Sequence, residues 1–260
     1  MGQTTLSTPN IETCKHGIPM HIKCRFCEED AEIAALPEDH PKCKHDRPEG
    51  YCYDCKHEEE TLARERKRNE EEEERRQYIY HHPEDQLRRC YVPKKYLKCS
   101  FDNFSGNDKL VKDCREHEGN VVLQGNTGSG KTHLAVSILR ERVRNMKHEG
   151  ALFETAPELL LSLRSTFDSN SLETEENVID RYSGAPFLIL DDLGSEKATE
   201  FSITSLYIII DRRDRELLPT IITTNMSLKE IEDHLSARIA SRLAGMKVIK
   251  INMPDYRKKR

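Results

Sequence analysis

The chain has 260 residues, of which 36% are hydrophobic and 33% are charged, and its formal net charge at pH 7 is -5. This length exceeds one domain of ordinary size, so we expect an accessory module beside a main domain. A mean hydropathy of -0.76, with no apolar run near the roughly 20 residues of a membrane span, predicts that the chain crosses no bilayer. The negative charge argues against a protein that coats nucleic acid through bulk electrostatics.

The N-terminal residues "MGQTTLSTPNIE" show no targeting signal. They lack the basic start, apolar segment and small-residue cleavage site of a signal peptide, and Leu6 stands where a myristoylation pattern needs Ser or Thr. We therefore expect a cytoplasmic protein. In that reducing compartment nine cysteines favour metal binding over disulfides.

Two cysteine-rich units follow each other in the first 55 residues. Each begins with Cys-x-His and ends, after six or seven intervening residues, with Cys-x-x-Cys. Four such ligands complete the closed tetrahedral shell of a structural zinc ion, and a module under about 70 residues with few large apolar groups needs such a metal to fold. The predicted zinc ligands are Cys14, His16, Cys24, Cys27, Cys43, His45, Cys52 and Cys55. The histidines at 21, 40 and 57 are possible substitutes for the assigned pair.

A highly charged connector follows the cysteine units. Residues 56–77, "KHEEETLARERKRNEEEEERRQ", mix both charge signs at helical spacings and contain almost no apolar residue. The pattern predicts a solvated helix or a semi-rigid spacer, and Pro83 and Pro93 interrupt any helix beyond it. The predicted domains are a zinc module at 1–56, a charged helical linker at 57–89 and an α/β domain at 90–260.

A phosphate-binding loop begins the α/β domain's chemistry. In "NVVLQGNTGSGKTHLAVSIL" a short β-branched strand leads into Gly-x-x-x-x-Gly-Lys-Thr and then into a helical apolar pattern. In such loops backbone N–H groups surround the phosphates, Lys131 reaches the β and γ oxygens, and Thr132 ligates Mg²⁺. The predicted ATP-binding residues are Gly125, Asn126, Thr127, Gly128, Ser129, Gly130, Lys131 and Thr132.

Two further strands end in polar residues. The apolar strand in "PFLILDDLGSE" ends in Asp191 and Asp192, which suit Mg²⁺ binding through water and orientation of the attacking water, respectively. Many ATPases of this type carry Glu at the second position, so we expect slow turnover without a partner. The strand in "PTIITTNMS" ends at Asn225, which is suited to hold the lytic water or to sense the γ-phosphate.

The last motif, "LSARIASRLAGMKVIKI", predicts a helix carrying Arg238 and Arg242, followed by a final strand. An arginine near the edge of such a domain can reach the ATP of a neighbouring subunit, which would make hydrolysis depend on assembly. The alternative is a solvated helix face, a reading that fits Arg238 better than Arg242.

Taken together, "YVPKKYLKCSFDNF", the phosphate-binding loop, "ETAPELLLSLRS", "LDDLG", "PTIITTNMS" and "ARIASRL" occur in this order. This set resembles the AAA+ ATPases of the DnaC-like helicase-loader and IstB-like transposition-helper group, over about residues 90 to 257. The resemblance implies a five-stranded parallel sheet between helices, ATP at Lys131 and Thr132, Mg²⁺ at Asp191, a sensor at Asn225 and an arginine finger at Arg242.

The resemblance also implies structural detail around that core. Two helices at about 157–167 and 172–182 would form an initiator-type insertion that contacts single-stranded DNA, for which Arg164 and Arg181 offer phosphate contacts. The family's helical lid is expected to be missing, so a lid-borne sensor arginine is absent unless Arg257 replaces it. The basic tail is the other candidate for a DNA contact.

Loaders of this kind, from bacteria and their phages, grip the replicative helicase with an N-terminal domain. By this resemblance the chain is predicted to load a hexameric replicative helicase, with ATP, Mg²⁺ and Zn²⁺ as cofactors, single-stranded DNA as a ligand and a homo-oligomer as its assembly. The alternatives are a transposition helper that delivers a transposase to DNA, and an adaptor whose ATP site is a slow switch.

Overall fold

The computed structural model describes residues 25–37, 41–47, 53–105, 107–117, 119–147, 149–168 and 171–256, with the backbone alone at 25–27 and 54. Contacts along the chain define two compact units, residues 1–73 and 74–260. The three-part division at 56 and 89 stays a prediction. Among the described helices, none combines the length and the apolar character that a bilayer span requires.

The first unit contains helix α1, Arg25–Ala34, and most of helix α2, Tyr53–His81. The charged connector is thus helical, and every residue from 56 to 78 is exposed. Pairs one turn apart support it, such as Arg64 with Glu60 at 3.6 Å and Lys67 with Glu71 at 3.8 Å. Exposed pairs of this kind contribute only about 0.3–0.5 kcal/mol each, so the helix depends on many of them.

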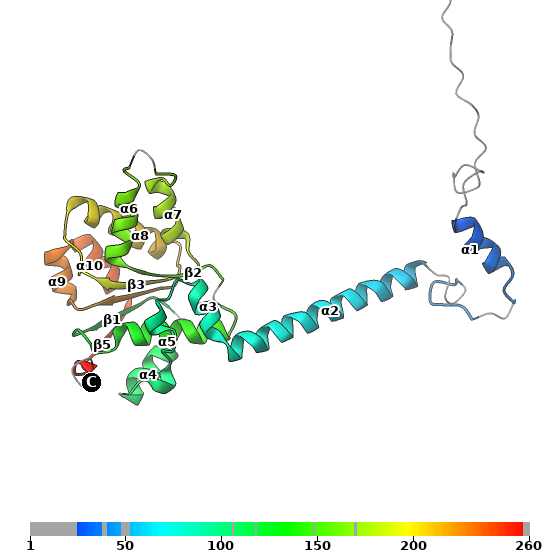
Figure 1. Ribbon diagram of the computed structural model, residues 1–260, viewed down its shortest axis with the longest axis horizontal. Helices are drawn as coiled ribbons and strands as arrows, with labels where there is room; N and C mark the ends of the chain where they lie inside the picture. The colour runs from blue at the N-terminus through cyan, green and yellow to red at the C-terminus, as the bar shows by residue number, and fades with distance from the viewer. Residues whose placement is uncertain are drawn as a thin grey trace, which may run out of the picture. The chain divides into compact units, whose positions relative to one another are not determined.

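The second unit is built on a five-stranded sheet (Figure 1). All neighbouring strands are parallel, and their spatial order is β2-β3-β4-β1-β5. The strands are β1 (Val121–Gly125), β2 (Ala151–Thr155), β3 (Phe187–Leu193), β4 (Thr220–Thr224) and β5 (Lys247–Ile251). The predicted five-stranded parallel sheet is confirmed, and its central strands are buried on both faces, which is why they read as continuous apolar runs.

Helices cover both faces of the sheet (Figure 1). Alternate residues of β1 point to different cores: Val121 and Leu123 to one, Val122 to the other. The first core is closed by α3 (Pro83–Arg89), α4 (Asp108–Arg115) and α5 (Lys131–Arg144). The second is closed by α6 (Ala156–Ser165), α7 (Glu175–Gly184), α8 (Glu200–Arg215), α9 (Leu228–His234) and α10 (Ala237–Ala244).

The segment ahead of β1 is part of the first core. Ile79 at the end of α2, Leu87 on α3, and Val92, Leu97 and Phe101 beyond it are all buried there. Two short 3₁₀ turns, Lys94–Tyr96 and Phe101–Asn103, shape this stretch. It therefore runs over the domain surface with its apolar side chains anchored beneath it.

The insertion between β2 and β3 consists of α6 and α7, as predicted, with the second helix beginning and ending two to three residues later than expected. Each buries an apolar stripe against the second core, Leu159 and Leu163 on α6 and Val178 and Tyr182 on α7. Thr155 and Thr174 begin the two helices by accepting a backbone N–H three residues on.

Candidate functional site

The loop between β1 and α5 requires glycine for its backbone and for close packing. Gly128 and Gly130 have φ values of 75° and 95°, in the left-handed region that side chains disfavour. A Cβ on Gly130 would lie 2.6 Å from Cε2 of Phe104, and one on Gly125 would lie 2.5 Å from the carbonyl oxygen of Ile251. The loop therefore curls tightly against neighbouring elements, and a side chain at these positions would prevent that packing.

Lys131 lies inside this loop and is only 5% exposed. Its Nζ donates to the carbonyl oxygens of Gly125 and Asn126, at 3.0 and 3.1 Å, and to Oδ1 of Asn225. Asn225 follows directly after β4, the neighbour of β1 in the sheet. The parallel sheet thus brings two predicted site residues, 94 positions apart in the chain, into one hydrogen bond.

Asp191 is the centre of a buried hydroxyl network. Oγ1 of Thr132 lies 3.0 Å from each carboxylate oxygen, and Oγ1 of Thr223 donates to Oδ1 at 2.6 Å. Burial raises the pKa of Asp191, while the hydrogen bonds from the two threonines and the charge of Lys131 oppose that rise. A carboxylate held this way, next to the loop threonine, is the oxygen-rich setting that Mg²⁺ prefers.

Asp192 lies at an irregularity in β3. The register between β3 and β4 shifts between Leu190 and Leu193, and Asp192 has a φ of 57°. Its backbone N–H donates to Oγ1 of Thr223 at 2.9 Å, and its side chain lines the pocket. The two adjacent carboxylates therefore have separate places, one behind Thr132 and one in the pocket wall.

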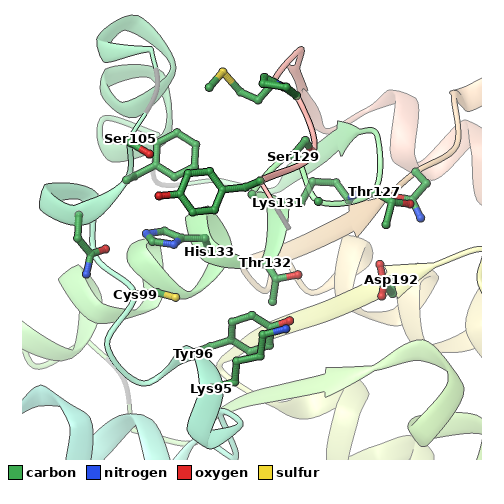
Figure 2. A pocket seen from close by; sticks show the side chains of 18 residues that line it. Lys95, Tyr96, Cys99, Ser105, Thr127, Ser129, Lys131, Thr132, His133 and Asp192 are labelled. Atoms are coloured by element: carbon green, nitrogen blue, oxygen red, sulfur yellow. Dashed lines mark hydrogen bonds between the residues drawn. The ribbon is translucent and has the colours of Figure 1, made fainter. Parts of the chain in front are cut away.

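A cavity of about 710 Å³ lies over the loop (Figure 2). Besides the loop, Thr132, Asp192 and Asn225, two other segments form its walls: residues 95–105 and residues 253–256. The lining residues from these segments and from α5 are Lys95, Tyr96, Cys99, Asn103, Phe104, Ser105, His133, Met253, Pro254 and Tyr256. Sequence reasoning had named none of these ten for the site.

The two added walls are attached to the loop and to α5. The backbone N–H of Tyr256 donates to the carbonyl oxygen of Gly128 at 3.0 Å. Nε2 of His133 lies 2.9 Å from the carbonyl oxygen of Ser100, and burial lowers the pKa of His133. The rings of Phe104 and His133 meet edge to face at 5.3 Å. These contacts place apolar and aromatic side chains of the pocket beside its phosphate-binding loop.

A triphosphate fits the donor set of the loop. Oγ of Ser129 is buried without a hydrogen-bond partner in the described structure, and glycine at 125, 128 and 130 adds no side chain of its own to the loop. Thr132 and Asp191 would hold Mg²⁺, and Lys131 would meet the phosphate oxygens.

Arg242 is not brought into this pocket. It lies on α10, where its Nε and a terminal nitrogen contact Oδ1 of Asp211 at 2.9 and 2.7 Å and another nitrogen lies 3.6 Å from Asp214. The hydrogen bond to Asp211 raises the pKa of Arg242. Arg238, one turn earlier, is exposed and stacks over the ring of Tyr207 at 5.8 Å.

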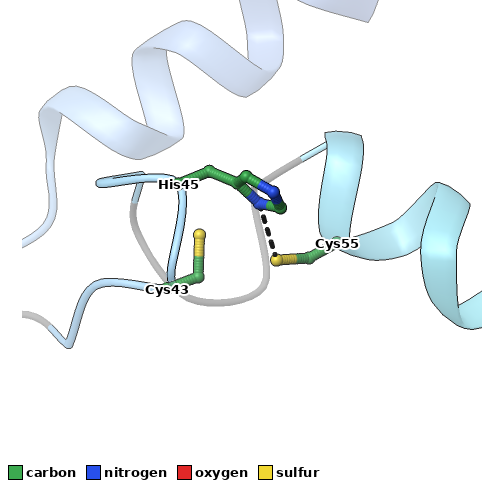
Figure 3. Close-up of side chains that lie close together, drawn as sticks. All are labelled: Cys43, His45 and Cys55. Carbon is green, nitrogen blue, oxygen red and sulfur yellow. Dashed lines mark hydrogen bonds between the residues drawn. The ribbon is translucent and has the colours of Figure 1, made fainter.

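In the first unit, Cys43, His45 and Cys55 gather with their ligand atoms within 4.8 Å of one another (Figure 3). A tight turn makes this possible: Asp46 has a φ of 56°, and its N–H donates to the carbonyl oxygen of Cys43. Nδ1 of His45 lies 3.3 Å from Sγ of Cys55, and Nε2 lies 3.7 Å from Glu58, where a carboxylate can orient a metal-bound ring. Two thiols and an imidazole suit zinc.

The other predicted zinc ligands cannot be placed. Cys14, His16, Cys24 and Cys52 lie outside the described residues, as does the side chain of Cys27. The same holds for Arg257. The sites that these residues were predicted to form stay predictions.

The second unit matches a known protein family. A family model described as "IstB-like ATP binding protein" matches residues 105–260. The chain belongs to this IstB-like family. The predicted membership of the DnaC and IstB group is thereby confirmed.

Several relatives of this IstB-like protein are named as replicative helicase loaders. It is 27% identical over 186 residues to the replicative helicase loader DnaC of Buchnera aphidicola subsp. Baizongia pistaciae, covering 66% of this chain and 75% of that protein. It is 26% identical over 168 residues to DnaC of Escherichia coli strain K12, covering 60% and 67%.

Solved structures agree on the fold of this IstB-like protein. The crystal structure of the DnaC helicase loader matches with a TM-score of 0.53 and 24% identity, covering 62% of this chain and all of that one. That of DnaI matches with a TM-score of 0.51 and 26% identity, covering 64% and 94%. DnaA from Aquifex aeolicus, bound to AMPPCP, shares the fold alone at 19% identity and a TM-score of 0.52, covering 62% and 51%.

Proposed function

We propose that this chain is an ATP-dependent loader of a replicative DNA helicase. The carrying observation is the network that joins Lys131 to Asn225 and Thr132 to Asp191 beneath a 710 Å³ pocket, in a chain whose named relatives are replicative helicase loaders. The network suits a protein that binds ATP, and the names of the relatives suggest that its partner is a replicative helicase.

In this proposal hydrolysis follows the geometry of the pocket. Lys131 binds the β and γ oxygens, and Asp192 with Asn225 orients a water that attacks the γ-phosphorus; the bond to the β-phosphate oxygen breaks and leaves ADP and phosphate. Mg²⁺, when bound at Thr132 and Asp191, neutralises phosphate charge. Because Lys131 now donates to Asn225, γ-phosphate oxygens would compete for that ammonium, so Asn225 is the group that changes partner when ATP binds.

The remaining parts have separate proposed roles. The N-terminal unit, with a zinc ion at Cys43, His45 and Cys55, grips the hexameric helicase, and α2 acts as a semi-rigid spacer. Arg242 acts as an arginine finger toward the ATP of a neighbouring copy in a homo-oligomer. The second unit also holds single-stranded DNA, for which the insertion helices α6 and α7 are the contact that family resemblance implies.

The ATPase part is tested by multiple-turnover hydrolysis of wild type beside Lys131→Ala, with and without single-stranded DNA. We expect slow turnover that DNA stimulates in wild type and that Lys131→Ala abolishes. If both proteins bind ATP but neither hydrolyses it, the site is a switch in an adaptor and this chain is not an ATPase.

The partner is tested by affinity capture of the full chain from bacterial lysate, read by mass spectrometry, beside Cys43→Ser/Cys55→Ser and the matched control Cys114→Ser. Cys114 is a buried apolar cysteine of the second unit. We expect the wild type and the Cys114→Ser control to recover replicative helicase, and Cys43→Ser/Cys55→Ser not to recover it. Recovery of a transposase instead would support the transposition-helper alternative, which the IstB-like family match keeps in view.

A further inference from the structure

The segment from Arg88 to Lys98, "RRCYVPKKYLK", carries five Lys or Arg residues and no acidic one, in a chain whose net charge is -5. It also carries two tyrosines. Neither the nucleotide site nor the zinc unit accounts for this concentration of positive charge. Only Lys95 and Tyr96 of this segment reach the nucleotide pocket.

The backbone of this segment is fixed from beneath. The N–H of Phe153, on edge strand β2, donates to the carbonyl oxygen of Cys90 at 2.8 Å. Buried Arg140 on α5 donates to the carbonyl oxygens of Leu97 and Cys99. With Cys90 and Leu97 buried, the polar side chains between them are held on a rigid support.

The outward side chains form a surface that we call the basic strip: Arg88, Arg89, Tyr91, Lys94 and Lys98, all exposed. Among the described residues none of its four cations makes an ion pair. The acidic residues nearest in sequence are engaged elsewhere: Glu84 with Arg140 at 2.6 Å, Asp85 with the hydroxyl of Tyr78 at 2.9 Å, and Asp102 with Arg115 at 3.6 Å. The charge of the basic strip is thus available to a polyanion.

Tyr91 stands where helix ends usually place glycine. It follows α3 with a φ of 63°, and the N–H of Val92 closes the turn by donating to the carbonyl oxygen of Leu87 at 3.0 Å. Its ring is 71% exposed. Unlike Leu217, which has the same backbone conformation after α8, Tyr91 presents a flat aromatic face on which a ligand can stack.

We infer that the basic strip binds single-stranded nucleic acid, with its four cations on phosphates and Tyr91 stacked on a base. The inference deepens the proposed function by assigning the strand to a surface other than the insertion. The insertion offers less charge: Arg181 is paired with Glu173 at 2.9 Å, and the first turn of α7 carries Glu175 and Glu176. An acidic protein segment is the competing ligand, but it has no use for an exposed aromatic face.

The test is fluorescence anisotropy of a labelled oligothymidylate of about 25 nucleotides with the full chain, over a range of salt concentrations. Arg89→Gln/Lys94→Gln removes two charges of the basic strip, and Lys247→Gln/Lys250→Gln removes two exposed charges of β5 as the matched control. We expect the first pair alone to weaken binding and to reduce the slope of log affinity against log salt by about 1.4, or about 0.7 per phosphate.

Tyr91→Gly is paired with Leu217→Gly. Leu217 has the same place after α8, with a φ of 54° and 84% exposure. Both substitutions relieve the same backbone strain, so both proteins should melt at or above the wild-type temperature. Tyr91→Gly should weaken oligonucleotide binding about tenfold, the lower range for loss of one stacked base, and Leu217→Gly should not.

Unchanged affinity in both strip variants would overturn the inference and leave the loader proposal standing, with DNA held elsewhere. A wild-type chain that captures helicase but binds no oligonucleotide would overturn it as well. Displacement of the oligonucleotide by polyglutamate, together with insensitivity to Tyr91→Gly, would assign the basic strip to an acidic protein. Failure to capture helicase while the strip variants lose DNA would contradict the loader proposal alone.

Discussion

At the scale of single residues, the nucleotide site places a carboxylate in a costly position. Asp191 is 4% exposed, and it is held by two threonine hydroxyls and faced by the charge of Lys131. Hydroxyl groups return only part of the hydration that a buried charge loses. The site thus holds free energy that a bound divalent cation would release.

The first prediction concerns Asp191→Asn. Burial raises the folded-state pKa of Asp191 above its unfolded value, so the stability that the protonated group contributes is lost as pH rises through the folded pKa. At neutral pH the substitution should raise the free energy of unfolding of the nucleotide-free chain by about 1 kcal/mol. It should also shrink the rise in melting temperature that Mg²⁺ and ATP together cause.

Thermal melts with and without Mg²⁺ and ATP measure both effects, and Asp192→Asn, half-buried in the pocket wall, is the matched control. A destabilised nucleotide-free Asp191→Asn protein would contradict this account of the carboxylate.

Sequence reasoning went furthest where a motif is local. Short sequence motifs predict the glycine loop, the paired aspartates and Asn225 as site residues. In the structure Lys131 is hydrogen-bonded to Asn225, and Thr132 is hydrogen-bonded to Asp191. Thr223 was not chosen, because a threonine inside an apolar strand has no signal until its partner strand is known. The ten added pocket residues were missed for the same reason, since tertiary folding alone brings their segments to the loop.

At the scale of elements, the pocket depends on two chain segments that carry no phosphate-binding motif. Residues 95–105 and 253–256 both line the cavity over the loop, and β5 ends at Ile251, before the second segment begins. The C-terminal segment can therefore be removed without touching the sheet. Met253 of this segment packs against the first core, so a thermal melt must first show that the shortened chain is folded.

The second prediction is for a chain truncated after Asn252, beside a control truncated after Tyr256. The first loses the pocket wall formed by Met253, Pro254 and Tyr256, and the control loses only residues 257–260. Titration with a fluorescent ATP analogue should show binding weakened about tenfold in the first and unchanged in the control, because an apolar wall that the nucleotide covers contributes on the order of 1.4 kcal/mol. Equal affinity in both proteins would show that this wall does not contact the nucleotide.

The third prediction concerns metal. Cys43→Ser/Cys55→Ser should lower the zinc content of the purified chain by one equivalent, measured by elemental mass spectrometry, while Cys114→Ser should not. Burial raises the pKa of Cys114 to about 12, so its thiol is a poor metal ligand at neutral pH. Full zinc content in the double variant would rule out the cluster of Cys43, His45 and Cys55 as the ligand set.

Local sequence patterns predict most of the helices and strands, but the assembly of the strands into one five-stranded sheet was expected only from the family resemblance. Buried apolar runs such as "PFLIL" and "TIITT" predict parallel strands, and the charged run predicts α2 because its pairs suit a helix. Nothing local predicts that Ile79 and Leu87 would join the core of the second unit. Ile79 lies near the end of a highly charged helix, and Leu87 is the one apolar residue of α3 besides Pro83.

At the scale of the whole molecule, Arg242 lies outside the nucleotide pocket of its own copy. It is held by Asp211, which also accepts Nε of Arg215 at 3.1 Å and keeps Arg242 oriented at the surface of α10. Such a pair on a solvent-accessible side chain adds little to the stability of the fold, because water screens its charges. The ion pair with Asp211 is therefore better explained by the orientation it gives Arg242 than by its contribution to the free energy of unfolding.

The fourth prediction follows from this placement. Arg242→Ala should leave ATP affinity and melting temperature close to wild type and lower turnover to the level of Lys131→Ala, while Arg238→Ala should not. Mixing Arg242→Ala with Lys131→Ala should restore part of the activity, because one copy then supplies the arginine and the other the intact pocket. Mixtures as inactive as their components would contradict an arginine supplied by a neighbouring copy.

The central claim, that this chain loads a replicative helicase, is tested most directly on a closed circle of single-stranded DNA carrying an annealed labelled oligonucleotide. A hexameric helicase ring must open before it can encircle such a strand, so displacement of the oligonucleotide reports loading. We expect displacement only with helicase, this chain and ATP together, and its loss with Lys131→Ala or Cys43→Ser/Cys55→Ser. Equal displacement by the helicase with and without this chain would contradict the claim.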